Sequence, residues 1–168
     1  RGQIFVMNAD GTNQRNVSAD PTGNWYDYQP EWSPDGSRIV FKQYDYGETE
    51  EHLFIIPANG HGYSVIPRTE DDYDPAWSRD GTRLAVQSIR DGPEDIFLLD
   101  IDGSNPVNLT GPQVAGTWVT HGNPDWSPDG NSIAYSANPQ EPVDELSDIW
   151  VMGADGSGKT NVTNTPAA

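Results

Sequence analysis

A repeated unit constrains the fold of this chain more than any other feature. Three ten-residue segments align without gaps: WSPDGSRIVF from Trp32, WSRDGTRLAV from Trp77 and WSPDGNSIAY from Trp126. An eight-residue element occurs four times: IFVMNADG from Ile4, LFIIPANG from Leu53, IFLLDIDG from Ile96 and IWVMGADG from Ile149. The tryptophans lie 45 and 49 residues apart. That spacing is close to the length of a β-propeller blade, roughly 40 to 50 residues.

Each unit reads as two β-hairpins. In the first, a Ser-Pro-Asp-Gly turn follows the tryptophan, and proline and Asp-Gly favour the backbone angles of a tight turn. In the second, Asp-Gly or Asn-Gly is flanked by hydrophobic residues, which is the strongest short-range hairpin signal. Two hairpins give four strands, the number in one propeller blade. The sequence therefore predicts an all-β fold, a β-propeller of four-stranded antiparallel blades.

Composition and charge exclude several classes of protein. The six tryptophans and seven tyrosines argue against disorder. The formal net charge of −17 opposes nucleic-acid binding, which needs cationic surface, and favours cationic partners or divalent metals. With no cysteine, neither a disulfide nor a thiolate metal site is possible. No apolar stretch approaches the ~18 residues of a membrane span, so we expect no membrane insertion.

The pattern P-x-W-S-P-D-G, I-x-F, I-[FW]-V-M-x-x-D-G and [VL]-[ST] resembles the repeat of the TolB-type β-propellers. The resemblance covers nearly the whole chain and recurs three and a half times. Three positions depart from it, since Arg79 replaces proline, Asn59 replaces aspartate, and Pro67 stands where the other repeats have serine or threonine. These departures leave the fold prediction intact.

The repeats divide the chain unevenly. Residues 1–18 form half a blade that lacks its inner strands, and residues 25–67, 71–110 and 119–164 form three blades. We therefore expect a fragment of a longer propeller, of six or seven blades by analogy with the family. The further blades would come from the same polypeptide or from another chain. The chain opens on Arg1 rather than methionine, so we also expect a processed or trimmed product.

Three motif matches are better explained by the repeat than by chemistry. GADGSGKT, from Gly153, fits the phosphate-binding loop pattern, but it occupies the turn of the fourth second hairpin and a β-like segment follows it. We therefore expect no nucleotide. Acidic turns such as Asp100 to Gly103 lack the first ligand and the glutamate of a calcium loop. The glycosylation patterns at Asn16, Asn108 and Asn161 recur at one place in the repeat, which favours a structural origin.

The candidate site precedes the tryptophan strand. In the TolB-type fold the first strand of each blade lines the central channel, so the resemblance implies that these residues surround one mouth of it. One column holds Asp27, Asp72 and His121, which could bind a divalent cation such as calcium. Neighbouring positions, predicted to contact a protein or peptide partner, are Tyr28, Gln29, Tyr73, Asp74 and Asn123. All of them could instead be hydrated polar groups that help the turns.

Two long acidic loops, between Phe41 and Leu53 and between Tyr135 and Ile149, are a second candidate for recognition. Catalysis has little support, because the sequence has no G-x-S-x-G elbow and no close histidine pair. A catalytic pair of Asp or Glu side chains is the alternative that the sequence leaves open, because acidic residues occur throughout the chain.

The leading hypothesis is a non-catalytic scaffold for protein–protein interaction without a cofactor. The resemblance implies a periplasmic or otherwise exported protein of the bacterial cell envelope, where TolB binds partners including the lipoprotein Pal. The alternative is a propeller that gates a larger prolyl-oligopeptidase-like or tricorn-type peptidase, or the metal-binding propeller of a polysaccharide-active enzyme.

Overall fold

The computed structural model describes residues 2–19, 24–46, 51–111, 119–139 and 147–163, and the regular elements within these ranges are all strands. They form one two-stranded and three four-stranded sheets, each an antiparallel meander in chain order. The half blade contains β1 (Phe5–Val6) and β2 (Arg15–Asn16). Blade A contains β3 (Trp25–Trp32), β4 (Arg38–Asp45), β5 (Glu51–Pro57) and β6 (Ser64–Val65). Blade B contains β7 (Asp72–Trp77), β8 (Arg83–Ser88), β9 (Asp95–Asp100) and β10 (Val107–Asn108). Blade C contains β11 (Val119–Trp126), β12 (Ser132–Pro139), β13 (Asp148–Gly153) and β14 (Thr160–Asn161).

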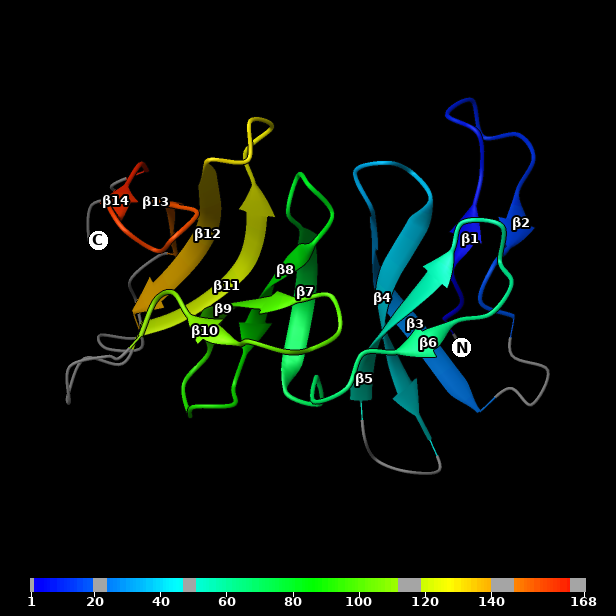
Figure 1. Ribbon diagram of the computed structural model, residues 1–168, viewed down its shortest axis with the longest axis horizontal. Coiled ribbons are helices and arrows are strands. Elements are labelled where there is room, and N and C mark those ends of the chain that lie inside the picture. The colour runs from blue at the N-terminus through cyan, green and yellow to red at the C-terminus, as the bar shows by residue number, and fades with distance from the viewer. Residues whose placement is uncertain (1, 20–23, 47–50, 112–118, 140–146, 164–168) are drawn as a thin grey trace.

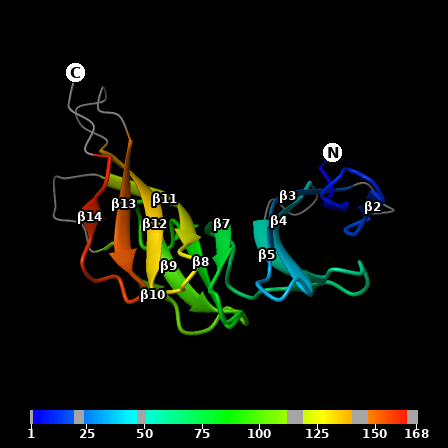
Figure 2. The ribbon, with the colours of Figure 1, turned by 90° about the horizontal axis from the view of Figure 1, so that it is seen from above.

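The sheets stand side by side along an open arc (Figure 1). Seen from above, the first strands β3, β7 and β11 lie on the inner side of the arc, and the later strands of each blade lie farther out (Figure 2). This is part of a β-propeller, with about three and a half blades, as the repeat predicts. No helix in the described ranges is long and apolar enough to cross a membrane.

The Ser-Pro-Asp-Gly turn is held by its own side chains. Between β3 and β4 the Ser33 hydroxyl donates to Asp35 (2.7 Å) and accepts the backbone N–H of Arg38 (2.9 Å), while Asp35 accepts the N–H of Ser37 (3.0 Å). Gly36 supplies a φ of 67° that disfavours other residues. The same bonds recur from Ser78 to Arg83 and from Ser127 to Ser132. These contacts explain why the motif accompanies every first hairpin.

The GADGSGKT segment is a β-turn, as its place in the repeat predicts. It joins β13 to β14, which pair through Trp150 with Asn161 and Val151 with Thr160. The Lys159 ammonium donates to the backbone oxygen of Gly156 (2.8 Å) within the turn. A phosphate-binding loop would instead place a helix N-terminus after the glycines.

The hydrophobic core lies between neighbouring blades. Each sheet turns one face toward the preceding blade and the other toward the following blade. Between blades A and B the buried residues are Val40, Leu53, Ile66, Trp77, Leu84, Val86, Phe97 and Leu99. Between blades B and C they are Ala85, Ile96, Leu98, Leu109, Ile133, Tyr135, Ala137 and Met152. Between the half blade and blade A they are Ile4, Val17, Ile39, Phe41 and Ile56. Each blade is therefore stabilised mainly by its neighbours, as in other repeat architectures.

The glycines of the last three second-hairpin turns pack on the blade, or half blade, before them. A Cβ placed on Gly103 would lie 2.1 Å from the backbone oxygen of Pro67, and one on Gly60 would lie 3.1 Å from the Cα of Val17. Gly156 approaches the Leu109 backbone oxygen in the same way. The contacted residues Val17, Ile66 and Leu109 each lie seven positions after the Asp or Asn of their own turn. The glycine of the next blade packs against this position, which explains why it is aliphatic in every repeat.

A hydroxyl joins the end of each blade to its third strand. The backbone N–H of Ile4, Ile96 and Ile149 donates to Ser18, Thr110 and Thr163, over 2.8, 2.9 and 3.0 Å respectively. Blade A has Pro67 at this point of the repeat, and Thr69 accepts the N–H of Leu53 instead (3.0 Å). The structure thus compensates for the departure with a threonine two residues later.

The glycosylation patterns have a structural explanation. The Asn108 amide donates to Asp95 (2.9 Å), the Asn161 amide to Asp148 (2.6 Å), and the Asn16 amide to Gln3 (2.7 Å). Asn and Ser/Thr recur together because both hold the start of the third strand.

Candidate functional site

Every first strand carries the same bulge. The register of β3, β7 and β11 shifts against the second strand between Tyr28 and Glu31, between Tyr73 and Ala76, and between Gly122 and Asp125. Within the bulges Gln29, Asp74 and Asn123 have positive φ angles of 51°, 45° and 51°, and a proline follows each of them. Bulges and strained backbone of this kind concentrate at functional sites.

The three bulges meet around one hollow, which we call the bulge hollow. It has a volume of about 360 Å³ and is lined by residues 29–31, 74–76 and 123–125. Because β3, β7 and β11 are the inner strands, the hollow faces the inner side of the arc (Figure 2). Three of the five predicted partner-contacting residues, Gln29, Asp74 and Asn123, lie here.

Direct contacts link the bulges of blades A and B. The side-chain amide of Gln29 donates to the Asp74 carboxylate, and the backbone N–H of Asp74 donates back to the Gln29 oxygen (3.2 Å). Asn123 instead donates to Ser136 of its own blade (3.2 Å). The bulge hollow is therefore braced on one side and more open toward blade C.

The bulge hollow is acidic. Glu31 and Asp125 join Asp74 in its lining. Burial, and then the charge of Asp125, raises the pKa of Glu31 above its ordinary value. Burial also raises the pKa of Asp74, although the bond from Gln29 opposes it. A cation in the hollow would relieve both destabilised carboxylates.

Glu31 and Asp125 are site residues that the sequence reasoning missed. They stand directly before Trp32 and Trp126. The signal in the sequence is the position between the proline and the tryptophan of each repeat, which is acidic in two of the three repeats.

Tyr28 and Tyr73, the other two predicted partner-contacting residues, belong to the junction between blades A and B. The Tyr28 hydroxyl donates to the Glu51 carboxylate (2.6 Å), and burial, followed by this bond, raises the pKa of Tyr28. The Lys42 ammonium lies 4.4 Å from the centre of the Tyr73 ring. Neither tyrosine lines the bulge hollow.

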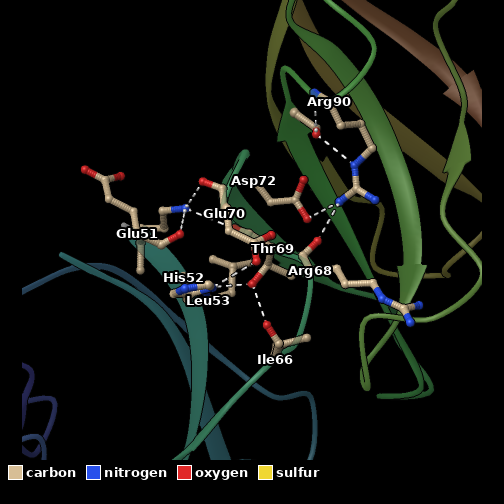
Figure 3. A network of polar contacts seen from close by, with 11 residues as sticks. Glu51, His52, Leu53, Ile66, Arg68, Thr69, Glu70, Asp72 and Arg90 are labelled. Atoms are coloured by element: carbon tan, nitrogen blue, oxygen red, sulfur yellow. Dashed lines mark hydrogen bonds and ion pairs between the residues drawn. The ribbon is translucent and has the colours of Figure 1, made fainter. Parts of the chain in front are cut away.

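Lys42 is fully buried at this junction. Its ammonium donates to three backbone oxygens, those of Glu51 (3.2 Å), Thr69 (3.1 Å) and Glu70 (3.0 Å). Figure 3 shows these three acceptors converging from β5 and from the connection that leads into blade B. Burial lowers the pKa of Lys42 to about 8, although nearby carboxylates oppose the shift. No motif in the sequence singled out this lysine.

The predicted metal ligands are each held by a separate neighbour. Asp72 pairs with Arg90, whose guanidinium also reaches the Arg68 backbone oxygen (Figure 3). Asp27 accepts from Ser18 of the half blade and from Gln43 (2.7 Å).

His121 lies 3.0 Å, Nδ1 to Oδ1, from Asp95 of blade B. Burial alone would raise the pKa of Asp95, but the bonds from His121, Asn108 and Thr110 outweigh it and hold the pKa below its ordinary value. Two members of the column, Asp27 and His121, therefore tie a blade to the one before it.

The structure does not bring Asp27, Asp72 and His121 together. Among the residues it describes, no group of three or more His, Cys, Asp or Glu side chains is placed to hold a metal ion. The predicted cation site at these residues gains no support. Much of the two acidic loops, including Glu48, Glu50 and Glu141, lies outside the described residues.

Comparison with known proteins agrees with the repeat. A profile of the TolB beta propeller domain matches residues 2–168. The chain belongs to the TolB beta propeller family. No curated protein matches its sequence.

Solved structures with this fold include two TolB proteins. A putative TolB from Agrobacterium tumefaciens has 23% identity and a TM-score of 0.73, over 98% of this chain and 56% of that one. TolB from Acinetobacter baumannii has 16% identity and a TM-score of 0.73, over 98% of this chain and 38% of that one. This chain therefore spans roughly half or less of either TolB protein.

An enzyme shares the fold equally well. An oligogalacturonate lyase in complex with manganese has 16% identity and a TM-score of 0.73, over 99% of this chain and 49% of that one. At such identity these likenesses show the fold alone, and function has to be argued from the site.

Proposed function

We propose that this TolB-family chain is a binding platform that holds a cationic segment of a protein partner in the bulge hollow. The observation that carries the proposal is the convergence of three equivalent bulges, one from each blade, on a single acidic hollow. A segment with lysine or arginine side chains there would meet the carboxylates of Glu31, Asp74 and Asp125, which all line the hollow.

The geometry favours recognition over catalysis. Among the described residues, His121 and Asp95 are the nearest arrangement to a catalytic pair, and they belong to a blade junction, where Thr110 and Asn108 also bind Asp95. The bulge hollow offers carboxylates and amides on rigid strands, which suits a charged, hydrogen-bonding ligand. We also infer, from the family resemblance, that the protein works in the bacterial envelope after export.

The proposal is tested by binding of a lysine-rich decapeptide, measured by calorimetry at about 0.15 M salt, where the Debye length is about 8 Å. The variant Glu31→Gln, Asp74→Asn, Asp125→Asn removes three charges from the hollow while keeping its shape. We expect at least tenfold weaker binding, since three partly exposed ion pairs contribute up to about 1 kcal/mol each.

A matched control removes three charges elsewhere. Asp10, Asp102 and Asp155 are acidic turn residues outside the hollow. Their change to asparagine should alter the affinity by less than about twofold, because exposed, distant charges are largely screened. Equal losses in both variants would show non-specific attraction to the acidic surface and would refute the proposal.

A second candidate, the propeller of a larger enzyme, follows from the likeness to the oligogalacturonate lyase. It differs in one measurable respect. A propeller that serves a separate catalytic centre would leave the peptide affinity independent of Glu31, Asp74 and Asp125.

A further inference from the structure

Blade A carries four tyrosines at one end of its inner hairpin. Tyr26 and Tyr28 alternate along β3, Tyr44 lies opposite Tyr26 in β4, and Tyr46 stands just beyond the end of β4. Because side chains alternate between the two faces of a sheet, all four belong to one face. Val40 is on the same face and is part of the core between blades A and B, so this face is turned toward blade B. We call Tyr26, Tyr28, Tyr44 and Tyr46 the tyrosine face.

The blade fold does not require these tyrosines. Blades B and C form the same four-stranded sheet with other residues at most of the equivalent places of the repeat. In place of the four tyrosines, blade B has Asp71, Tyr73, Ile89 and Asp91, and blade C has Thr120, Gly122 and Asn138 in place of the first three. Among the three blades the full set therefore occurs in blade A alone, and a structural role in the blade does not account for it.

The tyrosine face is open to solvent. Tyr46 and Tyr26 are 59% and 39% exposed. The rings form two pairs, with centres 5.7 Å apart for Tyr26 and Tyr28 and 5.1 Å apart for Tyr44 and Tyr46. Blades A and B, whose sheets flank this face, both have four strands, so the exposure does not come from an incomplete blade. Exposed aromatic side chains gathered in one place mark a binding surface.

The surroundings of the tyrosine face favour a cation. Glu51 lies opposite Tyr44 in the ladder, and its carboxylate accepts the Tyr28 hydroxyl (2.6 Å). Lys42, opposite Tyr28, shows how a positive charge is held here, because its ammonium lies 4.4 Å from the centre of the Tyr73 ring, within the range of a cation–π contact. Burial lowers the pKa of Lys42, but Glu51 and other nearby carboxylates favour its charged form. The face therefore offers aromatic rings beside negative charge.

The tyrosine face continues into the bulge hollow. Tyr28 directly precedes Gln29, which lines the hollow. A strand rises about 3.3 Å per residue, so Tyr26 and Gln29 are about 10 Å apart along β3. An extended segment of ten residues spans up to about 33 Å. One partner segment can therefore occupy the hollow and pass over the tyrosines.

We propose that the tyrosine face selects arginine in the partner segment. The basic side chains of that segment enter the bulge hollow, and an arginine guanidinium stacks on the exposed rings beside Glu51. A guanidinium is planar and more weakly hydrated than an ammonium, so it stacks on an aromatic ring where lysine does not. The inference rests on the proposed function, because the same segment has to occupy the hollow.

Two decapeptides test the selection. They are identical except that every lysine of one is arginine in the other, and calorimetry measures both at about 0.15 M salt. The arginine peptide should bind about fivefold more tightly, which is the gain from one exposed cation–π contact. In Tyr26→Leu, Tyr46→Leu the preference should fall below about twofold, because the apolar surface remains and the rings are lost. In Tyr26→Phe, Tyr46→Phe the preference should persist, because the rings remain.

The matched control is Tyr63→Leu. Tyr63 is 37% exposed, and its ring contacts Phe54, which packs on the core between the half blade and blade A. It therefore lies on the opposite side of blade A from the tyrosine face, and its loss should leave the arginine preference unchanged. A preference that came from the carboxylates alone would survive the leucine changes at Tyr26 and Tyr46, and that result would overturn the inference.

The outcomes separate this inference from the proposed function. The variant Glu31→Gln, Asp74→Asn, Asp125→Asn should weaken both peptides and leave the arginine preference intact. If it does so while the leucine variant keeps the full preference, the tyrosine inference is overturned and the bulge hollow stands. If the leucine variant loses the preference while the charge variant binds both peptides as tightly as the unchanged chain, the proposed function is overturned and the tyrosine face stands.

A measurement on the unchanged chain covers the case in which the leucine variant folds poorly. The δ-methylene protons of an arginine stacked on a ring move upfield in the NMR spectrum, because the ring current shields protons above its face. We expect this upfield shift when the arginine peptide binds. Its absence at saturation would overturn the inference.

Discussion

Substitution of Gly103 by alanine tests whether neighbouring blades touch as closely as the structure shows. Gly103, in the turn between β9 and β10 of blade B, has a φ of 78° and packs against the connection at the end of blade A. An added Cβ would lie 2.1 Å from the backbone oxygen of Pro67 and 3.3 Å from the Cγ2 of Ile66. The closest neighbour is backbone, so the clash is relieved only if the two blades move apart.

The expected cost has two parts. Alanine in the left-handed region costs about 1 to 2 kcal/mol. Overpacking at the junction adds about 1 to 3 kcal/mol. Gly11 and Gly36 separate the two, since their φ angles of 83° and 67° carry the same backbone cost while no atom lies within 4 Å of the added Cβ. The free energy of unfolding should therefore fall by about 2 to 5 kcal/mol in Gly103→Ala and by about 1 to 2 kcal/mol in either control.

Urea unfolding measures this difference, with tryptophan fluorescence as the signal because Trp77 is buried in the same junction. The slope of free energy against urea should stay unchanged in all three variants. If Gly103→Ala lost no more stability than Gly11→Ala and Gly36→Ala, the close packing of the β9–β10 turn of blade B against Pro67 would be wrong.

Three further predictions concern polar side chains that hold the blades in place. Lys42 has a pKa of about 8 in the folded chain and near 10.5 when unfolded. Between these pH values the unfolded state binds more protons. The free energy of unfolding should therefore rise by about 2 kcal/mol from pH 7 to pH 9.5 in urea titrations. In Lys42→Met this rise should be absent, and an equal rise would assign it to another group. Thr110→Val removes the hydroxyl that holds Ile96 and should cost about 1 to 3 kcal/mol in thermal unfolding, whereas Thr163→Val at the exposed equivalent should cost under about 1 kcal/mol. Asp72→Asn leaves the buried side of Arg90 without its carboxylate and should cost about 3 kcal/mol with no change in bound metal by mass spectrometry; loss of an ion would restore the cation-site hypothesis.

The repeat made the fold predictable because each turn is specified locally. In the first hairpin the serine binds the aspartate, and the glycine N–H donates to the serine backbone oxygen, all within six residues, so the local sequence determines the turn. For the same reason, the place of GADGSGKT in the repeat identified it as a turn. The compensation of Pro67 by Thr69 was not predictable, since the two residues play one role only when the connection folds back on β5.

The site was predictable in part. The alignment placed Gln29, Asp74 and Asn123 in one column, and their shared backbone geometry brings them to one hollow. Asp27 and Asp72 looked equally suitable as ligands because sequence shows residue type and not direction. Their side chains are buried, at 4% and 0% exposure, and bind Ser18 and Arg90. Lys42 escaped notice because its acceptors are backbone oxygens, which leave no trace in the sequence.

Amide chemical shifts recorded during a titration with the lysine-rich decapeptide test the central claim most directly. The account predicts that the amides of residues 29, 31, 74, 76, 123 and 125 shift together with one dissociation constant, because one hollow holds one peptide segment. The amides of Gly11, Gly103 and Gly156, in turns outside the hollow, should move little. Shifts spread over those turns, or separate constants for the three bulges, would contradict it.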